Sequence, residues 1–153
     1  MNVEQICSRP AITVQASATL LEVAELMRDH HVGAIVVTKA PIDQPVAAGI
    51  ITDRDIVRAQ LAHTADLSRL RAEQVMTRDP LVLNGAMSVT EAIQQLRLRG
   101  VRRAPVVNSN GALIGMVSTD DLLAYVCDEV VGLAQLVSQQ PSREGALSAA
   151  RDG

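Results

Sequence analysis

The chain contains the same pattern twice, and this internal repeat constrains its fold more than any other feature. Residues 10–13 (PAIT) align with residues 80–83 (PLVL) at an offset of 70, and residues 49–52 (GIIT) align with residues 115–118 (GMVS) at an offset of 66. The difference lies in one connection, which is longer in the first copy because it spans residues 39–45. Pro, Asn and Gly in these connections predict surface turns, where changes of length are tolerated. We therefore interpret most of the 153 residues as one duplicated unit.

Both copies predict the same order of elements. A short strand precedes a helix whose apolar residues recur at i, i+3, i+4 and i+7. Thr19 and Ser88 precede these helices, and each has a glutamate three residues later, which is typical of a capping box. Two further strands and a closing helix complete each copy. The expected strands are 11–14, 34–38 and 46–51 in the first copy and 81–83, 104–107 and 112–117 in the second, with the closing helices starting at about Thr52 and Ser118.

The predicted fold class is α/β (α+β), with two β-α-β-β-α repeats. Half the chain is too small to bury a sufficient core alone, so we expect the two sheets to pack together with pseudo-twofold symmetry. The expected division is a first repeat at 1–66, a linking helix at 67–75, a second repeat with an extended last helix at 76–137, and a flexible tail at 138–153.

Composition narrows the class of partner. The net charge is −3, which argues against binding duplex nucleic acid, and Tyr125 is the only aromatic residue, so the usual stacking platform for single strands is missing. We find neither an apolar run long enough for a membrane helix nor a signal-peptide pattern. Cys7 and Cys127 are far apart in the sequence and have no metal-binding spacing. They predict reduced thiols in a cytoplasmic protein.

The two strand-to-helix junctions share a motif: Gly, two apolar residues, Thr or Ser, two variable residues, and Asp. A glycine at a strand end lets another backbone or a ligand approach closely. The hydroxyl and the carboxylate of Thr52 and Asp55, and of Ser118 and Asp121, are three residues apart and point to the same side. Such a pair can bind the cis-diol of a ribose, and the helix N-terminus favours phosphate. The same spacing also fits ordinary helix caps, so both interpretations stay open.

These motifs resemble the cystathionine-β-synthase (CBS) domain family, arranged as the tandem pair called a Bateman module. The resemblance covers residues 7–128 and is carried by residues 49–56, 100–107 and 115–122. It implies two clefts between the repeats that bind adenosine derivatives: AMP, ADP or ATP, with S-adenosylmethionine or NAD as further possibilities. It also implies that Thr52 and Asp55 hold the ribose in one cleft and that Ser118 and Asp121 hold it in the other.

The resemblance assigns phosphate contacts to Arg102 and Arg103, and a backbone contact with the base to Ala104. The first copy has Gly33 and Ala34 where the second has the two arginines, which predicts clefts of unequal chemistry. Arg54, at the start of a helix, could reach a phosphate in either cleft. The alternative for all three arginines is a solvated surface position.

No nucleophile, acid–base or metal-ligand constellation stands out, so we expect neither an enzyme nor a metal site, and no required cofactor. The first hypothesis is a regulatory module that binds an adenine nucleotide and signals to a protein effector that the sequence does not identify. The family resemblance implies a homodimer formed through helices, and the apolar stripe of the last helix is a candidate contact surface. The alternative is a structural scaffold with empty clefts, in which the motifs serve only as caps.

Overall fold

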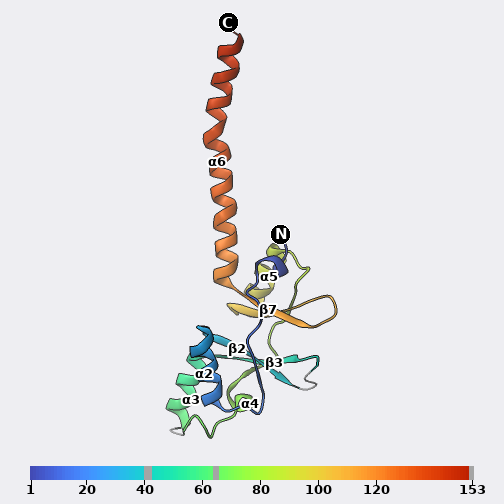
Figure 1. Cartoon of the computed structure of the whole chain (residues 1–153), viewed down its shortest axis with the longest axis vertical. Coiled ribbons are helices and arrows are strands. Elements are labelled where there is room, and N and C mark those ends of the chain that lie inside the picture. The colour runs from blue at the N-terminus through green and yellow to red at the C-terminus, as the bar shows by residue number, and fades with distance from the viewer. Residues whose placement is uncertain (40–42, 64–65, 152–153) are drawn as a thin grey trace.

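The computed structural model describes residues 1–39, 43–63 and 66–151, and the side chains of the last helix as far as Gln139. It consists of two halves, each with a sheet and helices, and one long helix that projects from the second half (Figure 1). The middle of the expected 39–45 turn lies outside the described residues. The elements are α1 (Val3–Ile6), β1 (Thr13–Gln15), α2 (Leu20–His30), β2 (Ala34–Lys39), β3 (Val46–Thr52), α3 (Asp53–His63), α4 (Ala72–Val75), β4 (Thr77–Arg78), β5 (Leu83–Asn84), α5 (Val89–Arg99), β6 (Arg103–Val107), β7 (Leu113–Ser118) and α6 (Thr119–Arg151).

The duplicated α/β pattern is confirmed. The first sheet has the order β1-β2-β3-β4 and the second has the order β5-β6-β7. In both, the first two strands are parallel and the next pair is antiparallel. A helix lies between the two parallel strands in sequence, as the crossover of a parallel pair requires. Each half has its own core, built around Leu20, Ile35 and Ile51 in the first and around Leu83, Val106 and Val117 in the second.

Capping boxes start the equivalent helices α2 and α5, as predicted. The Thr19 side chain accepts a hydrogen bond from the Glu22 N–H, and the Glu22 carboxylate accepts one from the Thr19 N–H at 2.7 Å. Ser88 and Glu91 repeat this geometry. The hydrogen bonds from the backbone and side chain of Thr19 lower the pKa of Glu22, and those from the side chain and backbone of Ser88 lower the pKa of Glu91. The charged carboxylates therefore stabilise both helix starts.

The two halves exchange their leading segments. Helix α1 opens the chain, but Val3 is completely buried in the core of the second half, and its N–H donates to the Met87 carbonyl at 2.9 Å. Helix α4 follows the first half in sequence, and Ala72 is completely buried in the first core. Figure 1 shows the N-terminal segment beside α5 and β7, with α4 among the elements of the first half. Each core is thus completed by the short helix that leads into the other repeat, which the boundaries at 66 and 76 did not anticipate.

The linking helix is shorter than predicted, because only residues 72–75 are helical. Residues 67–69 form a turn in which the Asp66 side chain accepts the Ser68 N–H, and this hydrogen bond lowers the pKa of Asp66. The turn presents the carbonyl groups of Leu67 and Leu70 to the Leu21 and Leu20 N–H groups at the start of α2. A helical 67–70 would use these carbonyl groups internally, so the contact with α2 favours the turn.

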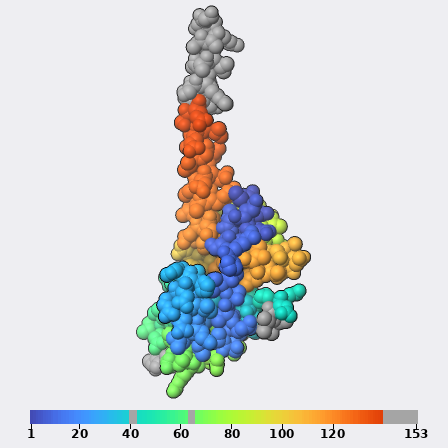
Figure 2. Space-filling model, viewed as in Figure 1, coloured from blue at the N-terminus to red at the C-terminus, as the bar shows by residue number. Residues whose placement is uncertain are grey.

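Helix α6 continues to Arg151, so the tail expected from residue 138 onward is helical over 138–151. Pro141 and Gly145 suggested a turn-rich tail, but Ala, Leu, Gln, Glu and Arg, which are among the strongest helix formers, make up most of the segment. Tyr125 packs against the second core, and beyond it the helix projects away from the body (Figure 2). Many apolar side chains between 123 and 137 are exposed. Over the described ranges, no helix has both the length and the apolar character needed to cross a membrane.

Candidate functional site: a cleft between the two repeats

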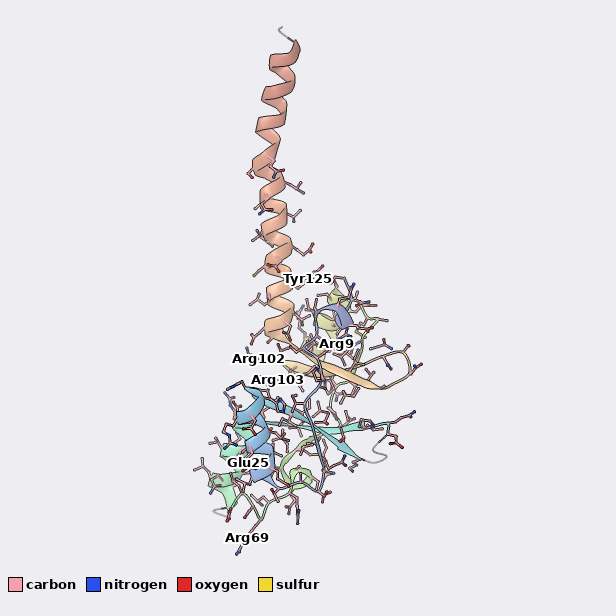
Figure 3. The ribbon with its side chains drawn as sticks, in the orientation of Figure 1. Arg9, Glu25, Arg69, Arg102, Arg103 and Tyr125 are labelled. Atoms are coloured by element: carbon pink, nitrogen blue, oxygen red, sulfur yellow. The ribbon has the colours of Figure 1, made fainter. Side chains whose placement is uncertain are left out.

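A cavity of about 510 Å³ lies between the two halves. Its first wall comes from the β3–α3 junction, with Thr52, Asp53 and Arg54. The rest comes from the segment around β4 and Pro80 and from the α5–β6 connection, with Arg102 and Arg103. Figure 3 shows Arg102 and Arg103 at the level where the two halves meet. Residues of both repeats therefore line the cavity, as expected for a cleft between them.

The structure brings Arg54, Arg102 and Arg103 to the same cavity, which decides between the two clefts that the sequence left open for Arg54. The side chain of Arg103 extends to the first half. A Cβ atom built on Gly33 would lie 3.7 Å from Nη1 of Arg103 and 3.3 Å from Oδ2 of Asp53. Of the described carboxylates, none lies within 4.0 Å of a nitrogen of these three guanidinium groups. Their charges are therefore available to an anion in the cavity.

Thr52 and Asp55 form a reciprocal cap at the start of α3. The Thr52 N–H donates to Oδ2 of Asp55 at 2.9 Å, and the Asp55 N–H donates to Oγ1 of Thr52 at 3.2 Å. Thr52 lines the cavity and Asp55 does not. The cap interpretation is confirmed at this junction, and Thr52 also lines the cavity.

Ser118 and Asp121 form the equivalent cap on α6, and they lie outside this cavity. Here the Ser118 hydroxyl also donates to Asp121, at 2.8 Å. Ala104, which was predicted to offer its backbone to the base, lies outside the cavity as well, because the whole residue is completely buried in the second half. The predicted residues therefore divide into a group at the cavity (Thr52, Arg54, Arg102 and Arg103) and a group away from it (Asp55, Ala104, Ser118 and Asp121).

At the two glycines of the shared motif, the backbone of another segment occupies the space that a side chain or a ligand would need. A Cβ atom on Gly115 would lie 2.5 Å from the Ser8 carbonyl oxygen, and one on Gly49 would lie 2.7 Å from the Thr77 carbonyl oxygen. Ser8 bridges to Met116 on β7, just as Thr77 pairs with Ile50 on β3. The glycine of each junction thus leaves room for one of the segments that the two halves exchange.

Sequence reasoning did not predict four charged residues of the cavity: Asp53, Arg78, Asp79 and Arg99. Arg78 is the last residue of the short strand β4, which was not predicted, and Arg99 is the last residue of α5. Arg99 donates to the Asp79 carbonyl oxygen at 2.8 Å. One available signal was that Arg99 and the predicted Arg102 flank the same helix end.

The cysteines and the other metal-ligating side chains lie scattered over the part of the chain that the structure describes. Cys7 and Cys127 are free thiols. Within that part, no cluster of three or more His, Cys, Asp or Glu side chains could hold a metal ion.

Comparisons with known proteins agree with this architecture. The family model "CBS domain" matches residues 3–62 and 72–128. An uncharacterized protein of Methanopyrus kandleri, MK0525, is 32% identical over 80% of the chain, which spans 61% of that relative's length. The CBS domain-containing protein YhcV of Bacillus subtilis is 34% identical over 79% of the chain and 82% of its own length. The structure of PAE2072 from Pyrobaculum aerophilum, complexed with AMP, shares 30% identity over 79% of this chain and 89% of its own, with a TM-score of 0.69.

Two β-α-β-β-α repeats that share a cleft define a tandem pair, and the matched residues cover more than half of the chain. The chain therefore belongs to the CBS domain family. Its two repeats form a non-catalytic regulatory module.

Proposed function

We propose that this module binds an adenosine-containing nucleotide in the cavity between its repeats and passes the signal to a separate effector protein. The single observation that carries the proposal is the meeting of Thr52 and Arg54 from one repeat with Arg102 and Arg103 from the other in one cavity. A ligand that contacts both repeats binds best to one of their relative arrangements, which is how binding becomes a signal. The AMP complex of the Pyrobaculum relative supports the choice of an adenine nucleotide. We place the module in the cytoplasm, where its free thiols remain reduced.

Replacing Arg103 with alanine is expected to lower the affinity for adenine nucleotides by about tenfold or more, because a hydrogen bond to a charged group contributes about 1.5–3 kcal/mol. Isothermal titration of AMP, ADP and ATP, with GTP and CTP for comparison, measures this effect. The matched control is Arg69→Ala, which removes a guanidinium at the far end of the first half (Figure 3).

If Arg103→Ala binds like the wild type, or if no adenine nucleotide binds, the proposed function is wrong. The scaffold alternative would then take its place, with Thr52 and Asp55 acting only as a cap. An Asp55→Asn variant separates the two roles of that carboxylate, since Asn caps helices about as well as Asp. Unchanged binding by a stably folded Asp55→Asn protein would remove Asp55 from the ribose contacts.

We further propose that a second copy of this chain covers the exposed face of α6. Five apolar side chains recur there at alternating steps of three and four residues: Leu123, Val126, Val130, Leu133 and Val137. This 3.5-residue period is that of a coiled coil, in which each seam packs against an equivalent one. The seam starts in an apolar groove of about 360 Å³ between α5 and α6, to which Leu123 and Val126 also contribute. Groove and seam form one continuous, self-complementary surface suited to a twofold dimer.

The variant Leu133→Glu is expected to convert the dimer into a monomer, because it places a charge in the apolar seam of each copy. Gln135→Glu adds the same charge at a position outside the seam and is expected to leave the dimer intact. Sedimentation velocity over a range of concentrations measures both. A monomeric wild type, or a dimeric Leu133→Glu variant, would contradict the proposed interface.

A further inference from the structure

The cavity carries far more positive charge than its surroundings. Five arginines and two aspartates line it, a formal excess of three positive charges in a chain whose net charge is −3. The arginines are Arg54, Arg78, Arg99, Arg102 and Arg103. An AMP phosphate carries at most two negative charges, so this lining exceeds what a single phosphate can neutralise.

The five arginines fall into two groups. Arg54, Arg102 and Arg103 belong to the junctions that the family motif covers, while Arg78 directly precedes Asp79 and Arg99, at the end of α5, contacts Asp79. The second group is anchored to backbone: Arg78 donates to the Glu73 carbonyl oxygen at 3.0 Å, and Arg99 donates to that of Asp79 at 2.8 Å. Because a guanidinium has five N–H donors, each retains several for an anion. The anchoring hydrogen bonds hold the two groups at the cavity wall.

The equivalent positions of the other junction lack this charge. Helices α2 and α5 both end in a left-handed residue, His31 and Gly100. When the repeats are aligned on these two residues, His30 is equivalent to Arg99, and Gly33 and Ala34 are equivalent to Arg102 and Arg103. The Asp53 N–H donates to the Gly33 carbonyl, and the Thr119 N–H donates to the Arg102 carbonyl in the same way. Asp53 and Thr119 are therefore equivalent, and the residue equivalent to Arg54 is Asp120. Only Arg78 has an arginine counterpart, Arg9, and both donate to the carbonyl of a preceding glutamate, Glu73 and Glu4.

We infer that this cavity selects ligands with a chain of two or more phosphates, and that Arg78 and Arg99 bind the phosphates beyond the first. The inference rests on the proposed function, since it assigns the adenosine end of the ligand to the same cavity. Paired guanidinium groups suit successive phosphates because each can donate two parallel hydrogen bonds to one phosphate. The junction formed by Ser118 and Thr119 offers no comparable charge, so the selectivity belongs to one cleft of the pair.

Isothermal titration with AMP, ADP, ATP and inorganic tripolyphosphate at one ionic strength tests the inference. The expected affinities rise from AMP to ADP to ATP, with ATP binding at least about tenfold more tightly than AMP. Arg78→Ala and Arg99→Ala are expected to remove most of that preference while AMP affinity changes little. Arg9→Ala is the matched control, because it loses the same kind of hydrogen bond to a glutamate carbonyl and is expected to keep the preference for ATP.

Equal affinities for AMP and ATP, or an unchanged preference in both Arg78→Ala and Arg99→Ala, would overturn the inference and leave the proposed function standing. Binding of tripolyphosphate as tight as that of ATP would show that the phosphates alone are recognised, which supports the polyphosphate selectivity and contradicts an adenosine site. Absence of binding by all four compounds would overturn both.

Discussion

Replacing Gly115 with alanine is expected to lower the free energy of unfolding by about 2–3 kcal/mol, as overpacked interior positions do. The new Cβ atom would lie 2.5 Å from the Ser8 carbonyl oxygen and 2.9 Å from Sγ of Cys7. The carbonyl cannot turn aside, because it accepts the Met116 N–H in the bridge that joins residue 8 to β7. Relief of the clash must therefore separate the N-terminal segment from the second sheet.

Urea denaturation of the two proteins, with the slope compared as well as the midpoint, measures this loss. Gly132→Ala is the matched control, since a Cβ atom on Gly132 meets nothing within 4 Å and Ala stabilises a helix by about 1 kcal/mol relative to Gly. The two variants make the same chemical change with opposite expected signs. Equal stability of Gly115→Ala and the wild type would show that the segment does not pack against β7 as described.

Val3→Asp is expected to destabilise the second half by about 3 kcal/mol or more, although Val3 is 80 residues from the Leu83 it packs with. Val3 is completely buried, so the variant must either bury a carboxylate or release α1 from the core. Release would also break the hydrogen bonds that the Val3 and Glu4 N–H groups donate to the Met87 and Gly85 carbonyls, both at 2.9 Å.

Thermal unfolding gives the size of this effect, and amide hydrogen exchange shows where it acts. Protection is expected to fall first in β5, β6 and β7 of the second half. Val57→Asp adds the same charge at a position of α3 that is 59% exposed, and it is expected to change the stability little. A Val3→Asp protein as stable as Val57→Asp would mean that the exchanged segment contributes nothing to the second core.

Local sequence signals determined the elements of this protein. The periodic apolar residues of α2 and α5 and the Thr19–Glu22 and Ser88–Glu91 boxes need only neighbours within one or two turns, so the order of strands and helices could be predicted. The same is true of Thr52 and Asp55, whose cap closes over three residues. The internal repeat then indicated that the second half copies the first.

Only the tertiary structure decided which segments complete each core and which charges meet. Helix α1 joins the second half and α4 joins the first because their contacts are with residues far away in the sequence, and no local pattern records such a pairing. The glycines could have admitted a ligand, and the fold shows that they admit backbone. Arg78 and Arg99 are ordinary surface arginines in the sequence. They become part of a candidate anion site because the pairing of β4 with β3 brings Arg78 to the cavity of Arg54, Arg102 and Arg103, and the end of α5 places Arg99 beside Asp79 in the same cavity.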